Sequence, residues 1–373
     1  MRLGIDARSL GPLRTGVGTY LHEILRCWSD AKSEEEIHLF SHQPICLDVE
    51  SSCKSHVTPA SWGLLWYLFQ SSRSIRTCEP NIFWGAQNLL PTSLPDKISA
   101  VITIHDWVHR WGVGLAPSLA YNLIHRYYVP RSIRKSNRIL AVSRFVADEI
   151  MKYYGAPSHF IEITPLGVNK AFWKSQLDPG KISSVLNRLE LEPPYILGVG
   201  TLEPRKNLTV LLEAFALLPV RHQRTHQLVL VGKKGWGEDK LLELIRSHPQ
   251  CSQIRLPGYV LGSDLPYVYA AAEMFVYPTV YEGFGLPALE AMAAGCPVVA
   301  SKVASLPEVV GSAGYWVETI GSSSDWSKAI CRLAESRELR ESLSSEGILR
   351  AAHFPWEKCA KLTREVLLQA AHK

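Results

Sequence analysis

One segment in the last third of this 373-residue chain constrains the fold more than any other. It reads YEGFGLPALEAMAAGCPVVAS over residues 281–301, and the preceding AEMFVYPT over 272–279 has the apolar pattern of a buried strand. CPVVAS over 296–301 predicts a second buried strand, and the residues between them predict a helix that starts at Pro287. Strand, glycine turn, helix and strand form a βαβ unit, which binds ligands at the carboxyl ends of its strands.

The turn before this helix predicts a site for phosphate or hydroxyl groups. Its glycines permit a tight bend, and its amides would lie at the positive end of the helix. These amides belong to Gly283, Phe284, Gly285 and Leu286. Glu282 lies in the turn and Glu290 about one turn inside the helix, so the two carboxylates could hold opposite ends of an elongated ligand. Alternatively, Glu282 is a solvated loop acid and Glu290 only a helix-dipole partner, each stabilising by roughly 0.3–1 kcal/mol.

Length and patterning predict two α/β domains. A chain of 373 residues is long for a single core, and 46% hydrophobic with 20% charged residues is typical of a globular protein. Apolar strands alternate with amphipathic helices in both halves, which predicts two doubly wound domains with parallel sheets and a ligand cleft between them. The strands with the clearest patterns are RLGID at 2–6, SAVITI at 99–104, RILAV at 138–142, YILGVGT at 195–201 and QLVLVG at 227–232.

The breaks in this pattern set the expected domain boundaries. We expect an amino-terminal domain over 1–172 and a linker over 173–194, where prolines and a glycine interrupt the pattern. A second domain should cover 195–353, and a last helix should lie within 354–373.

Two cations follow the first strand of the second half. GVGTLEPRKN over 198–207 places Arg205 and Lys206 just past a strand's carboxyl end, at the start of a helix. Arg can bind two phosphate oxygens and Lys acts as a point charge, so the pair suits a diphosphate. The alternative is a surface pair next to Glu203.

Two features of the first half are further candidates for ligand contact. RTGVGTY over 14–20 places Gly16, Val17 and Gly18 before a helix, too far from its strand for a dinucleotide fingerprint. We interpret it as an amide-rich flap that reaches a phosphate, or else as a connecting turn. His105 ends a buried strand, where a histidine is well placed to touch substrate, although lone histidines are usually structural.

Composition and motifs indicate which cofactors and which cellular compartment to expect. The chain contains no D-x-D pair, no C-x-x-C pair, and no His, Cys, Asp or Glu cluster with metal-site spacing. The sequence therefore predicts no metal site and no cofactor. The polar, glycine-rich start does not resemble a signal peptide, no apolar run approaches the roughly 20 residues of a membrane span, and the eight cysteines look like reduced thiols. We expect a cytoplasmic protein.

The net charge of +5 is concentrated in one stretch. Residues 51–147 carry eleven Lys or Arg against three acids, which indicates a phosphorylated acceptor or an acidic membrane surface, or simply a solvated surface. Residues 62–69 (WGLLWYLF), in the same stretch, predict an acceptor groove or the buried side of a helix. No nucleic-acid-binding motif accompanies the charge, so nucleic acid is not an expected partner.

Taken in order along the chain, these segments resemble family 4 of the retaining, nucleotide-sugar-dependent glycosyltransferases, which have the GT-B fold. GIDARSL followed by TGVGTY is similar to bacterial enzymes that add mannose to O-antigen and other polysaccharides. The segments that carry the family resemblance are TGVGTY at 15–20, IHD at 104–106, AVSRFVADEI at 141–150, TPLGVN at 164–169, GTLEPRKN at 200–207, LVGKKGWG at 230–237, residues 256–279, and the run from Glu282 to Glu290.

The resemblance implies a role for each matching residue. Glu290 would bind the ribose hydroxyls, and Glu282 with the amides of Gly283 to Leu286 would hold the sugar and the diphosphate. Arg205 and Lys206 would stabilise the departing nucleoside diphosphate. His105 would meet the donor sugar, and Gly16 to Gly18 would close over the phosphates. The backbone near Tyr259 and Val260 would face the base, and the last helix would pack on the first domain.

The implied reaction moves a hexose, with mannose from GDP-mannose as the best candidate, to a saccharide or lipid-linked saccharide acceptor. We expect front-face substitution, because Glu282 is the only motif acid that could act as a covalent nucleophile. The protein could lie peripherally at the inner face of the membrane. The alternatives are a nucleotide-sugar 2-epimerase of the same architecture and a non-catalytic nucleotide-sugar-binding subunit.

Overall fold

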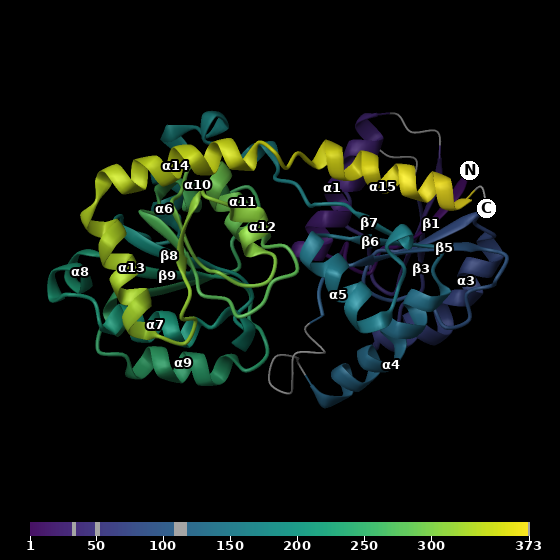
Figure 1. Cartoon of the computed structure of the whole chain (residues 1–373), viewed down its shortest axis with the longest axis horizontal. Coiled ribbons are helices and arrows are strands. Elements are labelled where there is room, and N and C mark those ends of the chain that lie inside the picture. Colours follow the sequence, from purple (N-terminus) through teal and green to yellow (C-terminus); the bar gives the residue numbers. More distant parts are fainter. Residues whose placement is uncertain (32–34, 49–52, 108–117, 372–373) are drawn as a thin grey trace. The chain divides into compact units, whose positions relative to one another are not determined.

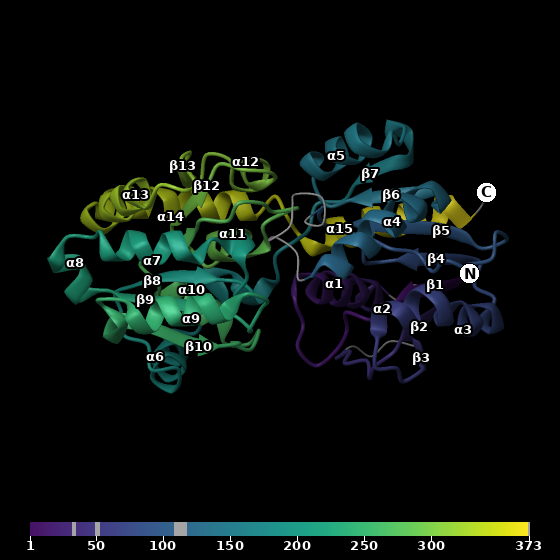
Figure 2. The same ribbon diagram turned by 90° about the horizontal axis from the view of Figure 1, so that it is seen from below.

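The computed structural model describes residues 1–31, 35–48, 53–107 and 118–371, and this part of the chain forms two compact units. The first unit contains the described residues up to 167 and those from 356 onwards. The second contains residues 168–355. Each unit has its own parallel sheet with helices on both faces (Figures 1 and 2).

The first unit has a seven-stranded sheet of order β3-β2-β1-β4-β5-β6-β7, in which every pair of neighbours is parallel. Its strands are β1 Arg2–Asp6, β2 Glu36–Ser41, β3 Lys54–Val57, β4 Ile82–Gly85, β5 Ser99–Ile104, β6 Arg138–Ala141 and β7 Ile161–Ile163. Its helices are α1 Gly16–Asp30, α2 Gly63–Leu65, the π-helical segment η1 Trp66–Gln70, α3 Ser71–Cys78, α4 Leu119–Lys135, α5 Arg144–Tyr154 and α15 Trp356–Ala371.

The second unit has a six-stranded parallel sheet of order β10-β9-β8-β11-β12-β13. Its strands are β8 Tyr195–Val199, β9 Gln227–Val231, β10 Ile254–Gly258, β11 Met274–Tyr277, β12 Val298–Ser301 and β13 Gly314–Val317. Its α-helices are α6 Pro179–Arg188, α7 Leu208–Ala216, α8 Val220–Thr225, α9 Glu238–Ser247, α10 Leu265–Ala271, α11 Leu286–Ala293, α12 Leu306–Val310, α13 Ser323–Glu335 and α14 Arg337–Ala351.

The first six strands of each unit have the same order in the sheet, and β7 is an additional strand of the first unit. This order locates the ligand-binding edge of each sheet. The order reverses between β1 and β4 in the first unit and between β8 and β11 in the second. Helices cover both faces, so the central strands are apolar throughout rather than alternating, as in LVLV of β9 and MFVY of β11. In open sheets of this kind ligands bind beyond the carboxyl ends of the strands where the order reverses. The structure thus confirms the doubly wound, parallel-sheet fold class.

Helix α15 belongs to the first unit although it ends the chain. It packs against α1, β4, β5 and β6, and it runs beside α1 in Figure 1. Trp28 in α1 donates from its indole nitrogen to the Ala360 carbonyl over 3.0 Å. Trp356, at the start of α15, is 2% exposed, and its ring lies 6.3 Å from that of Tyr20. Buried aromatic rings therefore fix the returning helix on the first sheet.

The boundary between the units differs from the expected one. Residues 173–194, expected as a linker, lie in the second unit, as do residues 168–172. Pro179 and Gly180, which suggested a break, instead begin helix α6, because Asp178 caps it by accepting from the Gly180 amide over 2.9 Å and Pro179 is its first residue. Arg188 at its end pairs with Asp264 over 2.8 Å.

The aromatic segment over residues 62–69 is divided between core and surface. Trp66, Tyr67 and Leu68 are buried in η1, whereas Trp62 is 73% exposed and Phe69 is also exposed. Only part of residues 62–69 therefore forms the buried side of a helix, as one of the two predictions expected. Among the described residues, no helix is long and apolar enough to cross a membrane.

We predict that Trp356→Ala lowers the free energy of unfolding by about 3–5 kcal/mol, because it leaves a cavity between α15 and α1. The measurement is urea denaturation followed by far-ultraviolet circular dichroism. Trp62→Ala is the matched control and should change stability by less than about 0.5 kcal/mol, since its ring is exposed. Equal losses for the two variants would show that α15 does not stabilise the first unit.

Candidate active site

A buried ion cluster lies at the carboxyl ends of β8 and β11. The 3₁₀ turn Pro204–Lys206 follows β8, and the turn that contains Glu282 follows β11. The Lys206 ammonium donates to Glu282 Oε1 over 2.6 Å, and Arg205 Nη1 lies 2.9 Å from Glu282 Oε2. One carboxylate therefore binds a separate cation with each of its oxygens.

Burial makes this cluster a strong electrostatic feature. Lys206 and Glu282 are each 6% exposed, and the Lys206 ammonium also donates to the Tyr277 hydroxyl over 2.8 Å. Burial alone would raise the pKa of Glu282, but the charges of Arg205 and Lys206 outweigh it and lower the pKa to about 2. Burial lowers the pKa of Lys206 against the opposing attraction of Glu282.

Further hydrogen bonds hold the cluster in place. The Arg205 guanidinium donates to Glu203 Oε1 over 2.6 Å and to the Tyr281 carbonyl over 3.0 Å. Thr279 Oγ1 lies 2.9 Å from Glu282 Oε1. The alternative of Arg205 and Lys206 as a surface pair next to Glu203 is therefore wrong, because both cations belong to a network of low exposure in which two cations face two carboxylates.

The glycine turn after Glu282 is fixed from the neighbouring loop. The Ser305 hydroxyl lies 2.9 Å from both the Glu282 and the Phe284 carbonyl oxygens. Gly285 has φ +105°, and a Cβ there would lie 2.5 Å from a methyl group of Leu306, so only glycine fits. Helix α11 begins at the next residue, and Ala288 and Leu289 of its first turn donate to the Gly285 carbonyl over 3.0 and 3.3 Å, so the amides that point out of this end belong to the turn before it. The turn therefore presents donors at a positive helix end.

Glu290 occupies a very different environment from Glu282. It lies inside α11, and within the described part of the chain its carboxyl meets the Tyr269 hydroxyl, 3.3 Å from Oε2. Burial raises the pKa of Glu290 to about 8, and the Tyr269 hydrogen bond only partly opposes this. Glu282 is thus an anion bound by cations, whereas Glu290, in the same segment, is an acid that keeps its proton near neutral pH.

The two residues expected near the base follow the end of strand β10. Gly258, the last residue of β10, has φ +77° and turns the chain. Tyr259 is 37% exposed, whereas the Val260 side chain is buried. Both lie at the carboxyl edge of the second sheet, as do Lys206 and Glu282.

His105 lies in the first unit, directly after β5. Its Nε2 is 2.8 Å from the Ala86 carbonyl, which can only accept, so Nε2 carries the proton and Nδ1 a lone pair. Burial lowers the pKa of His105, although the Ala86 hydrogen bond and Asp106 oppose this. The ring meets Tyr20 edge-on at 4.8 Å between centroids. A neutral, oriented imidazole therefore stands at the carboxyl edge of the first sheet.

The glycine-rich segment near the amino terminus is helical, which corrects its placement in a flap. Helix α1 starts at Gly16, so Gly16, Val17 and Gly18 form its first turn after Thr15 as the N-cap. A Cβ on Gly18 would lie 2.5 Å from the Ser9 carbonyl oxygen, so glycine allows α1 to approach the loop after β1. The amides of this turn remain candidates for anion binding as helix amides rather than as loop amides.

The structure groups some of the candidates and adds others. Arg205, Lys206 and Glu282 contact one another in the second unit, whereas Glu290 contacts Tyr269 instead. Sequence reasoning missed the neutral residues that complete these contacts: Tyr269, Tyr277, Thr279 and Ser305. Tyr277 and Thr279 end the apolar run of β11, which was the available signal. For Tyr269 and Ser305 the sequence contained no signal that indicated a place in the site.

Comparison with known proteins shows the family of the chain. Residues 14–172 match the family Glycosyltransferase Family 4, and residues 184–350 match the family Glycosyl transferases group 1. The chain is 34% identical to O-antigen chain mannosyltransferase B of Escherichia coli over 94% of both chains. It is 26% identical to O-antigen chain mannosyltransferase RfbU of Salmonella typhimurium, over 62% of this chain and 60% of that protein.

Two solved structures share the fold. WaaG, a glycosyltransferase involved in lipopolysaccharide biosynthesis, matches with a TM-score of 0.81 and 16% identity over 98% of this chain and 99% of its own. Anabaena HepE in complex with UDP and glucose matches with a TM-score of 0.74 and 19% identity over 99% and 100%. These matches confirm the GT-B fold expected from the sequence.

We predict that Glu290→Gln and Glu282→Gln change the pH dependence of stability in different windows. Because the pKa of Glu290 is raised from 4.5 to about 8, the wild-type protein loses stability as pH rises through this range, and Glu290→Gln should not. Because the pKa of Glu282 is lowered from 4.5 to about 2, the wild-type protein loses stability as pH falls through that range. Glu282→Gln should lack this loss and be about 3–5 kcal/mol less stable at neutral pH.

Urea denaturation at closely spaced pH values measures both effects. Each variant serves as the control for the other, because their windows lie on opposite sides of pH 4.5. Wild-type and variant profiles that run parallel throughout would contradict the assigned environments.

Proposed function

This chain belongs to glycosyltransferase family 4, and from that premise we propose that it transfers mannose from a nucleotide sugar to a saccharide or lipid-linked saccharide acceptor, with retention of configuration. The single observation that carries the proposal is the buried cluster of Glu282, Arg205 and Lys206 beside the first turn of α11. Two relatives named as O-antigen mannosyltransferases support the sugar, and GDP-mannose is the donor we favour.

The second unit offers a separate group for each part of such a donor. We propose that Glu290, which lies inside α11 next to the Tyr269 hydroxyl, binds the ribose hydroxyls. Its raised pKa lets it donate as well as accept, since the protonated acid has an O–H. The amides of Gly283 to Leu286 suit the diphosphate and the sugar hydroxyls. The backbone at Tyr259 and Val260 is proposed to face the base.

Arg205 and Lys206 are proposed to stabilise the departing diphosphate. With Glu203 and Glu282 they form a cluster of zero formal charge, so the incoming phosphates must draw a cation partly away from its carboxylate. The helix amides add positive potential without a competing carboxylate. Fixed cations and dipoles of this kind act where negative charge develops, in a site from which water is excluded.

The ion pairs of Glu282 favour front-face substitution over a covalent intermediate. A nucleophilic carboxylate needs an oxygen that can approach the anomeric carbon, but both oxygens of Glu282 are bound to cations within 2.9 Å. In the proposed step the bond from the anomeric carbon to the phosphate oxygen breaks as the acceptor oxygen bonds to the same face. The departing phosphate takes the acceptor proton.

The first unit is proposed to supply His105 and the first turn of α1. The neutral imidazole of His105 can hydrogen-bond to a sugar hydroxyl without adding charge. The amides of Gly16, Val17 and Gly18 suit a phosphate. We propose that the transfer requires no metal, since Arg205, Lys206 and the N-termini of α1 and α11 provide the positive potential.

A patch on the first unit is proposed to meet the acceptor or an acidic membrane surface. Phe69 in η1 and Tyr128 in α4 pack edge to face at 6.0 Å, so these elements are neighbours. Exposed apolar side chains lie on η1, on the segment directly before it and on α4: Trp62, Leu65, Phe69, Leu119, Leu123 and Tyr127. Exposed arginines lie on α3 and α4: Arg73, Arg76 and Arg131. Aromatic residues with arginines suit the interface of an anionic membrane, so we propose a peripheral location at the inner face of the membrane.

We predict that Lys206→Ala and Glu290→Ala each lower the rate of mannosyl transfer by about 10²–10³-fold while the protein stays folded. Arg205 still neutralises Glu282 when Lys206 is removed, so the fold should survive. The measurement is turnover of GDP-mannose with a lipid-linked saccharide acceptor, with the product anomer read by NMR. Lys328→Ala, on the exposed face of α13, is the matched control and should keep full turnover.

Several results would overturn this function. Near-normal turnover of either variant would remove that residue's role, and an inverted anomer would exclude the retaining reaction. Activity with UDP- or dTDP-sugars alone would replace the proposed donor. Mg²⁺-dependent recovery after chelator treatment would contradict metal-independent transfer.

We predict that reversing Arg73, Arg76 and Arg131 to Glu weakens binding to phosphatidylglycerol vesicles at least about 100-fold, since each basic residue near the surface contributes about 1 kcal/mol. Sedimentation with vesicles measures the binding, and neutral phosphatidylcholine vesicles are the lipid control. The protein control reverses Lys234, Lys328 and Arg337, which are exposed on the second unit. Equal loss in both triple variants would show a net-charge effect rather than a docking surface.

A further inference from the structure

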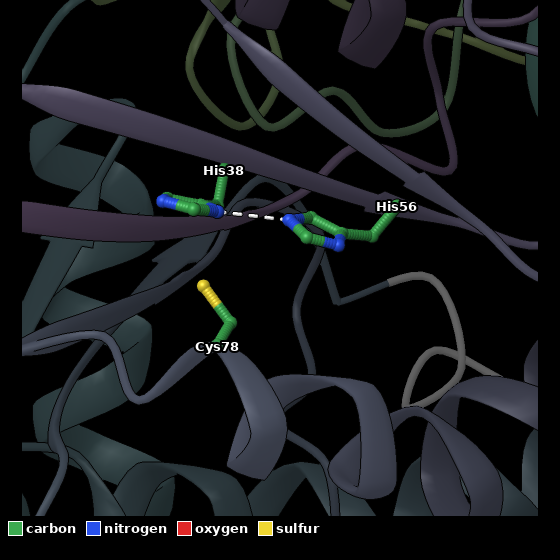
Figure 3. Close-up of side chains that lie close together, drawn as sticks. All are labelled: His38, His56 and Cys78. Atoms are coloured by element: carbon green, nitrogen blue, oxygen red, sulfur yellow. Dashed lines mark hydrogen bonds between the residues drawn. The ribbon is translucent and has the colours of Figure 1, made fainter.

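Three side chains of the first unit that are far apart in the sequence form a cluster with metal-ligand chemistry. His38 is in β2, His56 is in the neighbouring strand β3, and Cys78 is the last residue of α3. Their ligand atoms all lie within 4.8 Å of one another, and His38 Nδ1 is 2.8 Å from His56 Nε2. In Figure 3 the two imidazole nitrogens face each other, and the Cys78 sulfur points toward them.

We propose that His38, His56 and Cys78 bind one divalent cation of the zinc class. Two imidazoles and a thiolate are ligands of intermediate softness, which suit Zn²⁺ and exclude Mg²⁺ and Ca²⁺ as preferred ions. The ligand atoms of a tetrahedral zinc site lie roughly 3.3–3.8 Å apart, given bonds of about 2.0 Å to nitrogen and 2.3 Å to sulfur. Shifts of about an ångström would therefore bring the cluster to this geometry. The fourth position is left for water.

The backbone and the packing already hold the ligands near these positions. The Phe40 ring stacks on His56 at 4.8 Å between centroids and 13° between planes. Cys78 ends α3 because Glu79 takes the left-handed conformation with φ 48°, and Arg2 Nη1 donates to the Cys78 carbonyl over 3.4 Å. The site thus has fixed ligands from two strands and one helix end.

The protons of the cluster can be placed so that all three ligands bind. The Cys78 thiol releases its proton to become the thiolate. The proton of the hydrogen bond between His38 Nδ1 and His56 Nε2 must leave it, so that His38 carries its proton on Nε2 and His56 on Nδ1. His38 Nε2 is buried, makes no hydrogen bond among the described residues and lies 3.3 Å from Glu36 Oε1. A carboxylate next to the second nitrogen of a metal-binding histidine is the usual means of fixing that tautomer.

This cluster lies away from the proposed catalytic residue of the same unit. Across β2, β1, β4 and β5, His38 is in register with Gly4, Phe83 and Ala100. His105 is five residues beyond Ala100, so it lies roughly 16 Å further along the strands and roughly 14 Å across the sheet. The ion would not take part in the transfer. It would instead tie the short edge strand β3 and α3 to β2, and so stabilise the native state by mass action.

The test uses the full chain without a histidine tag, stripped of metal and titrated with Co²⁺ and then Zn²⁺. We expect one equivalent of Co²⁺, a near-ultraviolet thiolate-to-cobalt band, visible bands of a four-coordinate ion, and displacement by Zn²⁺. Cys78→Ser should abolish the thiolate band, and His56→Gln should weaken cobalt binding at least about tenfold. Zn²⁺ should raise the melting temperature of the wild-type protein but not of Cys78→Ser.

Cys251→Ser and His159→Gln are the matched controls, because both residues are exposed and outside the cluster. They should keep the cobalt spectrum and the stoichiometry. Absence of the thiolate band in the wild-type protein, or a band unchanged in Cys78→Ser, would overturn the proposal and show that the three side chains only pack together. Mannosyl transfer is measured separately and does not depend on either outcome.

Discussion

The organisation of the second unit depends on one buried carboxylate that binds a buried lysine and a partly buried arginine. Strands β8 and β11 are neighbours in the sheet, with Ile196 in register with Met274. The turns that follow them therefore meet, one with Arg205 and Lys206 and the other with Glu282. Because the sheet order reverses at this pair, helices leave to opposite sides and open the edge to a ligand. Pairing within 2.9 Å makes the buried Lys206 and the partly buried Arg205 tolerable there.

Burial alone would raise the pKa of both glutamates of one short segment, but their partners move the two pKa values apart. Glu282 meets cations and stays ionised, whereas Glu290, only eight residues later, meets a tyrosine hydroxyl and tends to stay protonated. Such a difference separates a group that organises charge from one that binds a neutral, hydroxylated moiety. A sugar nucleotide presents both kinds of surface, a charged diphosphate and neutral hydroxyl groups, which is why this pairing supports the proposed donor.

Much of the fold could be predicted because parallel strands covered on both faces are apolar along their whole length. β1 and β5 have the predicted bounds, β8 starts at the predicted residue, and α15 lies within the predicted range 354–373. Residues 173–194 were misassigned because Pro179 and Gly180 are equally compatible with a break and with a helix start. Gly16 and Gly18 were misplaced for a related reason, since glycine occurs both in loops and at close helix approaches.

The sequence by itself determined the βαβ segments, the glycine turns and the identity of the charged residues at strand ends, because these depend on local periodicity and backbone sterics. Only the tertiary structure decided the partners of those charges. Strand order brought Glu282 to Arg205 and Lys206, and placed Tyr269 beside Glu290. It also grouped His38, His56 and Cys78, which no spacing along the chain indicates. Contacts between side chains from different strands arise from the sheet order, which is set by the packing of the whole domain rather than by any local segment.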